Sequence, residues 1–242
     1  MKYSIIIPTL NEEKLLFNLL EYLTKERTEK NLDFEIIVSD GASTDKTQEV
    51  ALNFCDKLIV HDSDARQTIA EGRNKGAENA SGDIFIFVNG DVKMINLDYF
   101  LKIIDEDLST NKFIAWTCKV NVDPDDRTFF DTIFLGFYNW YFHLLNTMGV
   151  GMGRGECHVM YRDNFIRFGG YDDSIVAGED FEFYKRLRKQ GKIKFSTKYT
   201  IFESPRRYRK LGHLKILLTW LLNSIFVLLT KKSLSQKWEE VR

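Results

Sequence analysis

The chain contains an unbroken run of β-branched and aromatic residues, Ile84 to Val88, which ends at Asn89-Gly90-Asp91. A strand that is apolar on both faces must be covered on both, as is typical of an interior strand in an α/β sheet. The run delivers Asp91 to the carboxyl end of that strand, and ligands of open α/β sheets bind at this edge. Because Asn-Gly-Asp is also favourable turn chemistry, a plain strand-end turn is the alternative.

Strand and helix patterns alternate three times over roughly the first ninety residues. The predicted strands are Tyr3 to Ile7 (ended by Pro8), Phe34 to Ser39, Leu58 to His61 and Ile84 to Val88, and the predicted helices run from Thr9–Glu13 to Lys25, from Ser43–Asp45 to Asn53, and from Ile69 to Asn79. This alternation predicts an α/β fold with a mostly parallel central sheet, flanked by helices and joined by right-handed crossovers.

Beyond Asp91 the pattern is looser. We predict strands at Phe113 to Val122 and His158 to Tyr161, an aromatic-rich helix at Phe129 to Leu145, a flexible loop at Gly149 to Gly155, a helical turn at Asp163 to Phe168, a helix at Glu179 to Lys189, and late strands at Ile193 to Phe195 and Tyr199 to Phe202. A length of 242 residues allows one large α/β domain or two small ones.

The cysteines indicate the compartment. Cys55, Cys118 and Cys157 are far apart and odd in number, and no CxxC pair occurs. Neither a zinc site nor a disulfide framework is therefore indicated, and we expect a reducing compartment. Met1 and Lys2 lead directly into strand-like residues, so we expect no secretory signal peptide.

Acidic residues follow three of the predicted strands: Glu12 after the first, Asp40 after the second and Asp91 after the fourth. In a parallel sheet all three project from one edge, although they span about eighty residues of sequence. Each could instead be a helix N-cap favoured by the helix dipole. Their expected convergence favours a shared site for a phosphorylated, metal-bound ligand.

Five motifs resemble, in order and spacing, those of the inverting family 2 glycosyltransferases, which have the GT-A nucleotide-diphosphosugar transferase fold. They are SIIIPTLNEE (Ser4 to Glu13), SDGASTDKT (Ser39 to Thr47), GRNKGAENASGD (Gly72 to Asp83), VNGD (Val88 to Asp91) and GED (Gly178 to Asp180). The resemblance covers roughly residues 3–205, most of the chain. Each motif alone is weak, whereas five in order are specific.

The resemblance implies a nucleotide-sugar site. Pro8, Leu10 and Glu12 match the loop that holds the nucleoside, with Glu12 placed to bond ribose hydroxyls. Asp40 matches the carboxylate that accepts hydrogen bonds from the base, and Arg73 matches a basic residue near the nucleotide. A cation at Arg73 would offset diphosphate charge, while the alternative is a solvated helix residue.

Asn89-Gly90-Asp91 occupies the place of the family's DxD motif, in which the last aspartate coordinates Mg²⁺ or Mn²⁺ bridging the two phosphates. The resemblance therefore implies Asp91 as the metal ligand. Such hard ions prefer oxygen ligands and substrate phosphates. Asn89 departs from the pattern: its amide can bond a ribose hydroxyl or a metal-bound water but carries no charge, so we expect weaker metal affinity.

Gly178-Glu179-Asp180 resembles the pair that supplies the catalytic base. Inverting transfer is an in-line displacement, and a carboxylate must take the proton of the attacking hydroxyl. The resemblance implies Asp180 in this role and Glu179 as its orienting neighbour. The alternative is an acidic first helical turn favoured by the dipole. His213 is a further candidate metal ligand, although a lone histidine beside a basic segment is more often a surface residue.

The C-terminal part is basic and apolar. From Ser196 onward there are ten Lys/Arg against three Asp/Glu, a balance of +7, so the first 195 residues carry −8. Arg206 and Arg207 are predicted either to close over the donor diphosphate or to contact anionic lipid. The predicted helix at Leu214 to Thr230, at ~1.5 Å per residue, is too short for the ~30 Å membrane core. Flanked by Lys/Arg, it is better suited to lie in the interface, while packing on the protein or pairing two copies is the alternative.

These features together predict a GT-A domain at residues 1–205 and a membrane-associating segment at 206–242. The expected function is metal-dependent, inverting sugar transfer from a nucleotide-diphosphate sugar to a hydroxyl or lipid-phosphate acceptor, at the cytoplasmic face of a membrane and in the synthesis of envelope polysaccharide or glycolipid. We expect no nucleic-acid partner, and a homodimer stays open. The alternative, supported by Asn89, is a non-catalytic homologue that binds sugar nucleotide or scaffolds a membrane complex.

Overall fold

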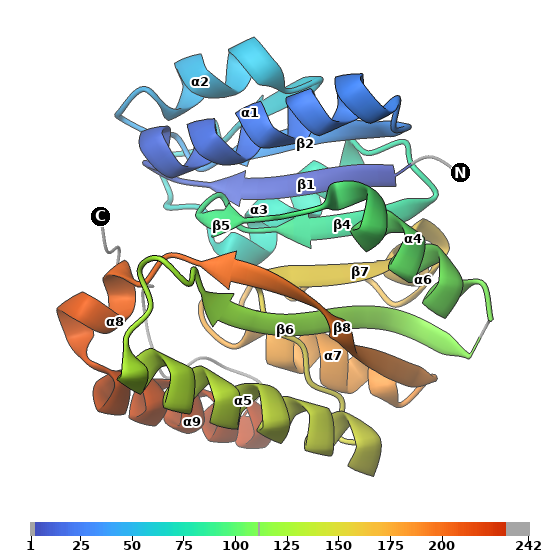
Figure 1. The fold of residues 1–242 in the computed structure, drawn as a ribbon, viewed down its shortest axis with the longest axis vertical. Helices are drawn as coiled ribbons and strands as arrows, with labels where there is room; N and C mark the ends of the chain where they lie inside the picture. The colour runs from blue at the N-terminus through green and yellow to red at the C-terminus, as the bar shows by residue number, and fades with distance from the viewer. Residues whose placement is uncertain (1–2, 111, 231–242) are drawn as a thin grey trace.

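The computed structural model describes residues 3–110 and 112–230. Figure 1 shows a central sheet with helices on both faces, in which eight strands follow the order β3-β2-β1-β4-β7-β6-β8-β5. The strands are β1 (Tyr3–Thr9), β2 (Phe34–Asp40), β3 (Lys57–Val60), β4 (Ile84–Val88), β5 (Val92–Lys93), β6 (Phe113–Val122), β7 (Cys157–Tyr161) and β8 (Lys192–Glu203). The helices are α1 (Glu13–Lys30), α2 (Thr47–Phe54), α3 (Ile69–Glu78), α4 (Leu97–Leu108), α5 (Phe129–Met148), α6 (Arg162–Arg167), α7 (Glu179–Arg188), α8 (Arg206–Leu211) and α9 (His213–Thr230).

The first four strands are mutually parallel, and their apolar residues are divided between two helical layers. Alternate residues of a strand point to opposite faces. Ile5 and Ile7 of β1 therefore belong to the core that contains the leucines of α1, whereas Ile6 belongs to the core beneath α3. The predicted α/β fold with a mostly parallel, helix-flanked sheet is confirmed.

The direction of β7 determines which loops reach the functional edge. β7 runs antiparallel to β4, with Val88 opposite Cys157, and antiparallel to β6. β6 and β8 are parallel to each other and consequently point the same way as β4. The carboxyl ends of β1, β2, β4, β6 and β8 and the amino end of β7 therefore meet at one edge.

Three predictions about elements were wrong. β1 continues through Pro8 to Thr9; beyond Ile6 it is paired only with β2, where a missing N–H is tolerated. Helix α4 was not predicted, although its six buried apolar residues have helical spacing and Asn96 caps it. The two late strands are one strand, β8, because a register shift between Cys118 and Lys119 absorbs the interruption.

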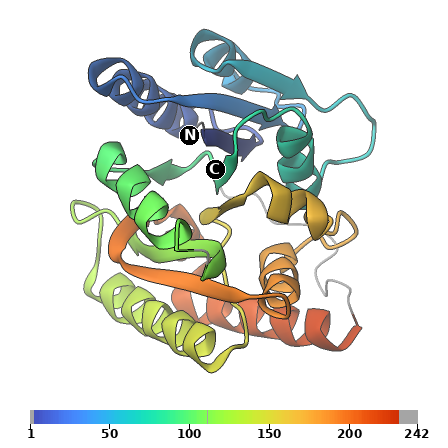
Figure 2. The same cartoon turned by 90° about the vertical axis from the view of Figure 1, so that its right-hand side faces the viewer.

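α5 and α9 lie side by side at one end of the molecule, as Figures 1 and 2 both show. Trp220 of α9 packs edge-on against Tyr138 of α5, with ring centroids 5.3 Å apart. Buried Asp131 accepts hydrogen bonds from Arg209 and from His213 Nε2 at 2.7 Å, which fixes the start of α9. None of the described helices is both long and apolar enough to span a bilayer. Residues 231–242 of the predicted C-terminal segment, including Lys231 and Lys232, lie outside the described residues.

Candidate active site

A cavity of about 500 Å³ opens at the edge where the strand ends meet. Its wall combines residues from the loops after β1, β2 and β4 with residues of the loop before β7, the start of α7 and the segment after β8. The polar and charged side chains on this wall include Glu12, Arg66, Arg73, Asn89, Asp91, Arg154, Glu156, Glu179, Asp180, Glu203, Arg206 and Arg207. Pro8, Leu10 and Gly41 also line it.

Arg206 joins two of the predicted acids. Its Nη1 donates to Glu12 Oε2 at 2.7 Å and its Nη2 donates to Glu12 Oε1. The same Nη2 donates to Asp91 Oδ2 at 3.1 Å. The expected convergence of Glu12 and Asp91 is therefore present, and a guanidinium supplies the positive charge that both carboxylates meet in this structure.

Asp40 has a different environment from these two acids. Its fully buried carboxylate accepts from Ser43 N at 2.8 Å and from Gln48 Nε2 at 3.0 Å, and it is not on the cavity wall, although Gly41 is. Ser43 Oγ also accepts from the backbone N–H of Asn11, so Asp40 braces the loop after β2 against the loop after β1. A contact between Asp40 and a base stays a prediction.

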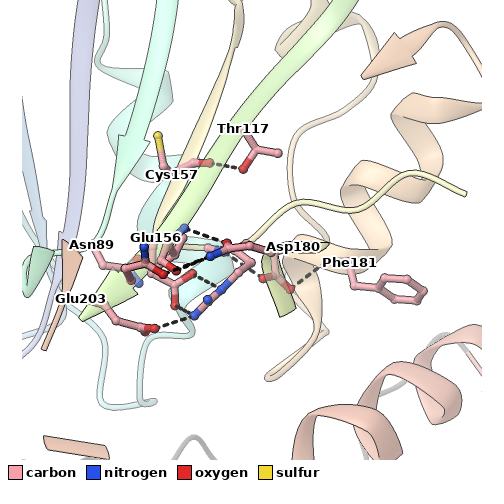
Figure 3. A network of polar contacts seen from close by, with 12 residues as sticks. Asn89, Thr117, Glu156, Cys157, Asp180, Phe181 and Glu203 are labelled. Atoms are coloured by element: carbon pink, nitrogen blue, oxygen red, sulfur yellow. Dashed lines mark hydrogen bonds and ion pairs between the residues drawn. The ribbon is translucent and has the colours of Figure 1, made fainter. Parts of the chain in front are cut away.

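Arg73 is the centre of a buried polar network, part of which Figure 3 shows around Asn89 and Asp180. Its Nη1 donates to Glu179 Oε1 at 2.6 Å. Its Nη2 donates to Asn89 Oδ1 at 3.1 Å and to the Gly155 carbonyl at 2.9 Å. One arginine thus ties the loop after β4 to the start of α7. The solvated-residue alternative for Arg73 is wrong, because the side chain is 1% exposed.

Asp180 sits in the first turn of α7, which Gly178 opens with a φ of 91°. Its Oδ2 accepts from Gly155 N at 3.0 Å and its Oδ1 accepts from Phe181 N at 2.7 Å. Burial, and then the negative charge of Glu179, raise the pKa of Asp180 to about 7, against the opposing effect of Arg73. A carboxyl group with a pKa near neutrality is suited to accept a proton from a substrate.

Buried Arg154 forms a second network with partly buried Glu156 and Glu203, which sequence reasoning missed. Arg154 Nη2 donates to Glu203 Oε1 at 2.8 Å, and Arg154 Nε lies 3.2 Å from Glu156 Oε2. Burial raises the pKa of Glu203 to about 7, although the Arg154 charge opposes this. No spacing signal marks these residues, because Arg154 is embedded in a glycine run and Glu203 ends an irregular strand.

The segment Gly149 to Gly155 was predicted to be flexible, but residues 151–155 are buried against α7. A Cβ at Gly151 would lie 2.4 Å from Arg188 Cβ, and one at Gly153 would lie 2.7 Å from the Tyr184 ring. The glycines therefore permit close packing rather than motion. This packing sets the Gly155 N–H against Asp180.

Asp91, on the cavity wall, would suit a divalent ion that is bound together with a diphosphate. Mg²⁺ and similar ions are commonly held by one or two carboxylates plus substrate phosphates. Asp91 supplies one carboxylate, whereas the Asn89 oxygen already accepts from Arg73. No cluster of three or more His, Cys, Asp or Glu in residues 3–110 and 112–230 could hold a metal. His213 bonds Asp131 and does not line the cavity.

The family model described as "Glycosyl transferase family 2" matches residues 4–173. One relative is a dolichyl N-acetyl-α-D-glucosaminyl phosphate 3-β-D-2,3-diacetamido-2,3-dideoxy-β-D-glucuronosyltransferase of Methanococcus voltae, 29% identical over 208 residues, which cover 78% of this chain and 62% of the relative. Another is a validoxylamine A glucosyltransferase of Streptomyces hygroscopicus subsp. limoneus, 37% identical over 89 residues, which cover 36% of this chain and 19% of the relative. The chain thus spans less than two thirds of either relative.

Solved structures share the fold at low sequence identity. The mannosyltransferase PcManGT from Pyrobaculum calidifontis, solved with GDP-Man and Mn²⁺, gives a TM-score of 0.65 at 21% identity over 88% of this chain and 61% of that one. Residues 1–349 of Staphylococcus aureus TarS, solved with UDP-GlcNAc, give 0.62 at 19% identity over 93% of this chain and 73% of that one. The fold and the family suggested by the five motifs are confirmed.

Proposed function

Because the chain belongs to glycosyl transferase family 2, we propose that it transfers a sugar, with inversion, from a nucleotide-diphosphate donor to a hydroxyl or a lipid phosphate at a membrane. The observation that carries this proposal is the joint placement of Asp91 and Asp180 on one cavity. A carboxylate suited to a metal-bound diphosphate and a carboxyl suited to proton transfer thus share the same enclosed space.

The donor would lie along the loops after β1, β2 and β4. Pro8, Leu10 and Gly41 would hold the nucleoside and Glu12 its ribose hydroxyls, while Arg206 and Arg207 lie on the wall beside the diphosphate position. This arrangement requires Arg206 to exchange its bonds with Glu12 and Asp91 for phosphate oxygens. Guanidinium groups pair with phosphate oxygens as well as with carboxylates, so Arg206 is chemically suited to either partner.

In the proposed step, the acceptor oxygen forms a bond to the anomeric carbon while the bond from that carbon to the diphosphate oxygen breaks. The leaving nucleoside diphosphate takes the electron pair, and the Asp180 carboxylate takes the proton of an attacking hydroxyl. Glu179, fixed by Arg73, orients the helical turn that carries Asp180. A divalent ion bound at Asp91 with the diphosphate would stabilise the departing charge.

A membrane location is supported by the surface of α5 and α9. Each helix packs one side on the protein and exposes large apolar side chains on the other. The exposed residues are Phe129, Phe130, Ile133, Phe137 and Trp140 of α5 and Leu214, Leu218, Leu221 and Leu222 of α9. Large apolar side chains that gather on an exposed face often mark a site of interaction with a membrane or another protein. We therefore propose that these helices contact a membrane, and the expected reducing compartment, inferred from the three scattered cysteines, places this contact at the cytoplasmic face.

The alternative, a non-catalytic sugar-nucleotide-binding homologue, rests on Asn89. Asn89 Oδ1 accepts a hydrogen bond from Arg73, so the departure from the motif has a structural role that is independent of turnover. The test is a screen of UDP-, GDP- and dTDP-sugars by thermal shift with and without Mn²⁺, followed by a donor-hydrolysis assay on the wild type and Asp180→Asn. We expect the variant to bind the donor as the wild type does and to lose at least about 100-fold in turnover. Metal-independent binding without turnover in the wild type would support the alternative.

A further inference from the structure

The cavity has an apolar wall opposite the loops assigned to the donor. We define this wall by Tyr138, Tyr141 and Leu145 of α5, Val150 of the following loop, and Trp220 and Leu221 of α9. It is built from the two helices at the lower end of the molecule in Figure 1, whereas the donor loops come from the strands above them. An aromatic and aliphatic surface of this kind has no evident use for a nucleotide diphosphate.

The proposed base lies at the boundary between the two regions. Phe181, the next residue after Asp180, belongs to the cluster that contains Tyr138 and Met152 and packs against Trp220. Figure 3 shows its ring directed away from the polar network around Asp180. A molecule whose reacting oxygen faces Asp180 would therefore extend its remaining atoms along the apolar wall.

The apolar wall continues to the outside of the protein. Val150 and Leu221 line the cavity, yet they are 37% and 47% exposed. Trp140 of α5 and Leu218 of α9 are also exposed and belong to the apolar surface assigned to the membrane. The hydrocarbon chain of a bound molecule would therefore meet apolar side chains all the way from a bilayer to Asp180.

Arg154 provides a polar contact where the apolar wall ends. Its side chain is 5% exposed and lies 5.4 Å from the centre of the Trp220 ring. Nε and Nη2 are satisfied by Glu156 and Glu203, but buried Nη1 has no hydrogen-bond partner within the described part of the chain. A charged N–H group that is shielded from water and has no acceptor raises the free energy of the folded protein. An acceptor oxygen of a ligand at this point would therefore bind favourably. Arg154 precedes Gly155, which itself bonds Asp180.

We propose that this wall is the binding site for the chain of an amphiphilic acceptor, with a long alkyl or isoprenoid chain on Tyr141, Val150 and Leu221. One oxygen of the acceptor head group accepts from Arg154 Nη1 while the reacting oxygen faces Asp180. The head group is phosphate-like, since a guanidinium recognises phosphate oxygens well. The inference rests on the proposed transferase function, to which it adds the chemistry of the acceptor.

The test is calorimetric binding of butyl, octyl, dodecyl and phenyl phosphate, each below its critical micelle concentration, to the full chain with and without UDP or GDP and Mn²⁺. We expect affinity to rise about fourfold for each methylene that enters the wall, the equivalent of ~0.8 kcal/mol, and then to level off. Val150→Asp should weaken octyl phosphate at least about tenfold. The matched control is Met148→Asp, 70% exposed and off the cavity, which should have little effect.

Arg154→Lys keeps the charge and removes the unpaired Nη1, so it should weaken all four phosphates by about the same factor, roughly tenfold. Equal affinities for butyl and dodecyl phosphate, or tighter binding of phenyl than of octyl phosphate, would overturn the long-chain site. Equal losses in the Val150 and Met148 variants would do the same. If affinity depends on the length of the alkyl chain but the protein binds no nucleotide, the proposed acceptor site stands and the transferase assignment is wrong. If the protein binds nucleotide but affinity does not depend on the length of the alkyl chain, the acceptor site is wrong and the transferase assignment stands.

Discussion

Removal of the Arg73 side chain should show how strongly the two sides of the site are coupled. Arg73→Met would leave the Glu179 carboxylate, which is 6% exposed, without its partner at 2.6 Å. Breaking a buried ion pair from one side costs about 3–5 kcal/mol. For a domain of this size, each kcal/mol lowers Tm by roughly 2–4 °C, so a decrease of about 10 °C is expected.

The double variant Arg73→Met/Glu179→Gln provides the control, because it removes the unpaired charge. It should recover most of the lost free energy of unfolding, giving a coupling of at least ~2 kcal/mol in urea denaturation followed by circular dichroism. The Arg73 charge also holds down the pKa of Asp180, so the pH midpoint of transfer should move upward in the single variant. Additive effects of the two substitutions, or a loss below ~1 kcal/mol for Arg73→Met, would refute this account of the network.

Three further predictions concern the same residues and the exposed helices. Since burial raises the pKa of Asp180 to about 7, the contribution of this group to folding stability should fall as pH rises from 4 to 8, and Asp180→Asn should melt above the wild type at pH 8 but not at pH 4; a constant difference in Tm would count against it. Arg206→Gln should weaken donor binding yet strengthen Mn²⁺ binding to the ligand-free protein, because Asp91 loses its cation, and titration calorimetry measures both. Phe129→Ser/Phe130→Ser should lower flotation with anionic vesicles by roughly tenfold or more, as each exposed Phe contributes ~1.5–3 kcal/mol when buried; unchanged flotation would remove α5 from the membrane surface.

The donor half of the fold was predictable because its signals are local. Ile84 to Val88 is a continuous apolar run, as is typical of a buried strand, and it was predicted with the bounds of β4. Phe113 to Val122 was also predicted with the bounds of β6, although Thr117, Lys119 and Asn121 interrupt its apolar residues. Parallel strands then place their carboxyl ends together without further information. Glu12 and Asp91 could for this reason be assigned to one site from sequence.

The rest of the site depends on long-range pairing. The antiparallel direction of β7 cannot be read from Cys157 to Tyr161, yet it decides that Arg154 and Glu156 reach the cavity. Asn89 could only be recorded as a departure from a motif, since its partner Arg73 lies on another element. Asp40 shows a similar limit: a carboxylate at a strand end can contact a ligand or brace a loop, and spacing does not distinguish these uses, so its contact with a base stays a prediction.

Because β7 runs opposite to β4, the cavity also joins two parts of the chain that supply different kinds of side chain. Apart from the α8 arginines, the groups proposed to bind the nucleotide come from residues up to and including Asp91, whereas the apolar wall of the cavity comes from α5, the loop after it and α9. Under the proposed function, evolution can therefore alter the later segments, and with them the acceptor, while the earlier segment continues to bind the same type of nucleotide-sugar donor.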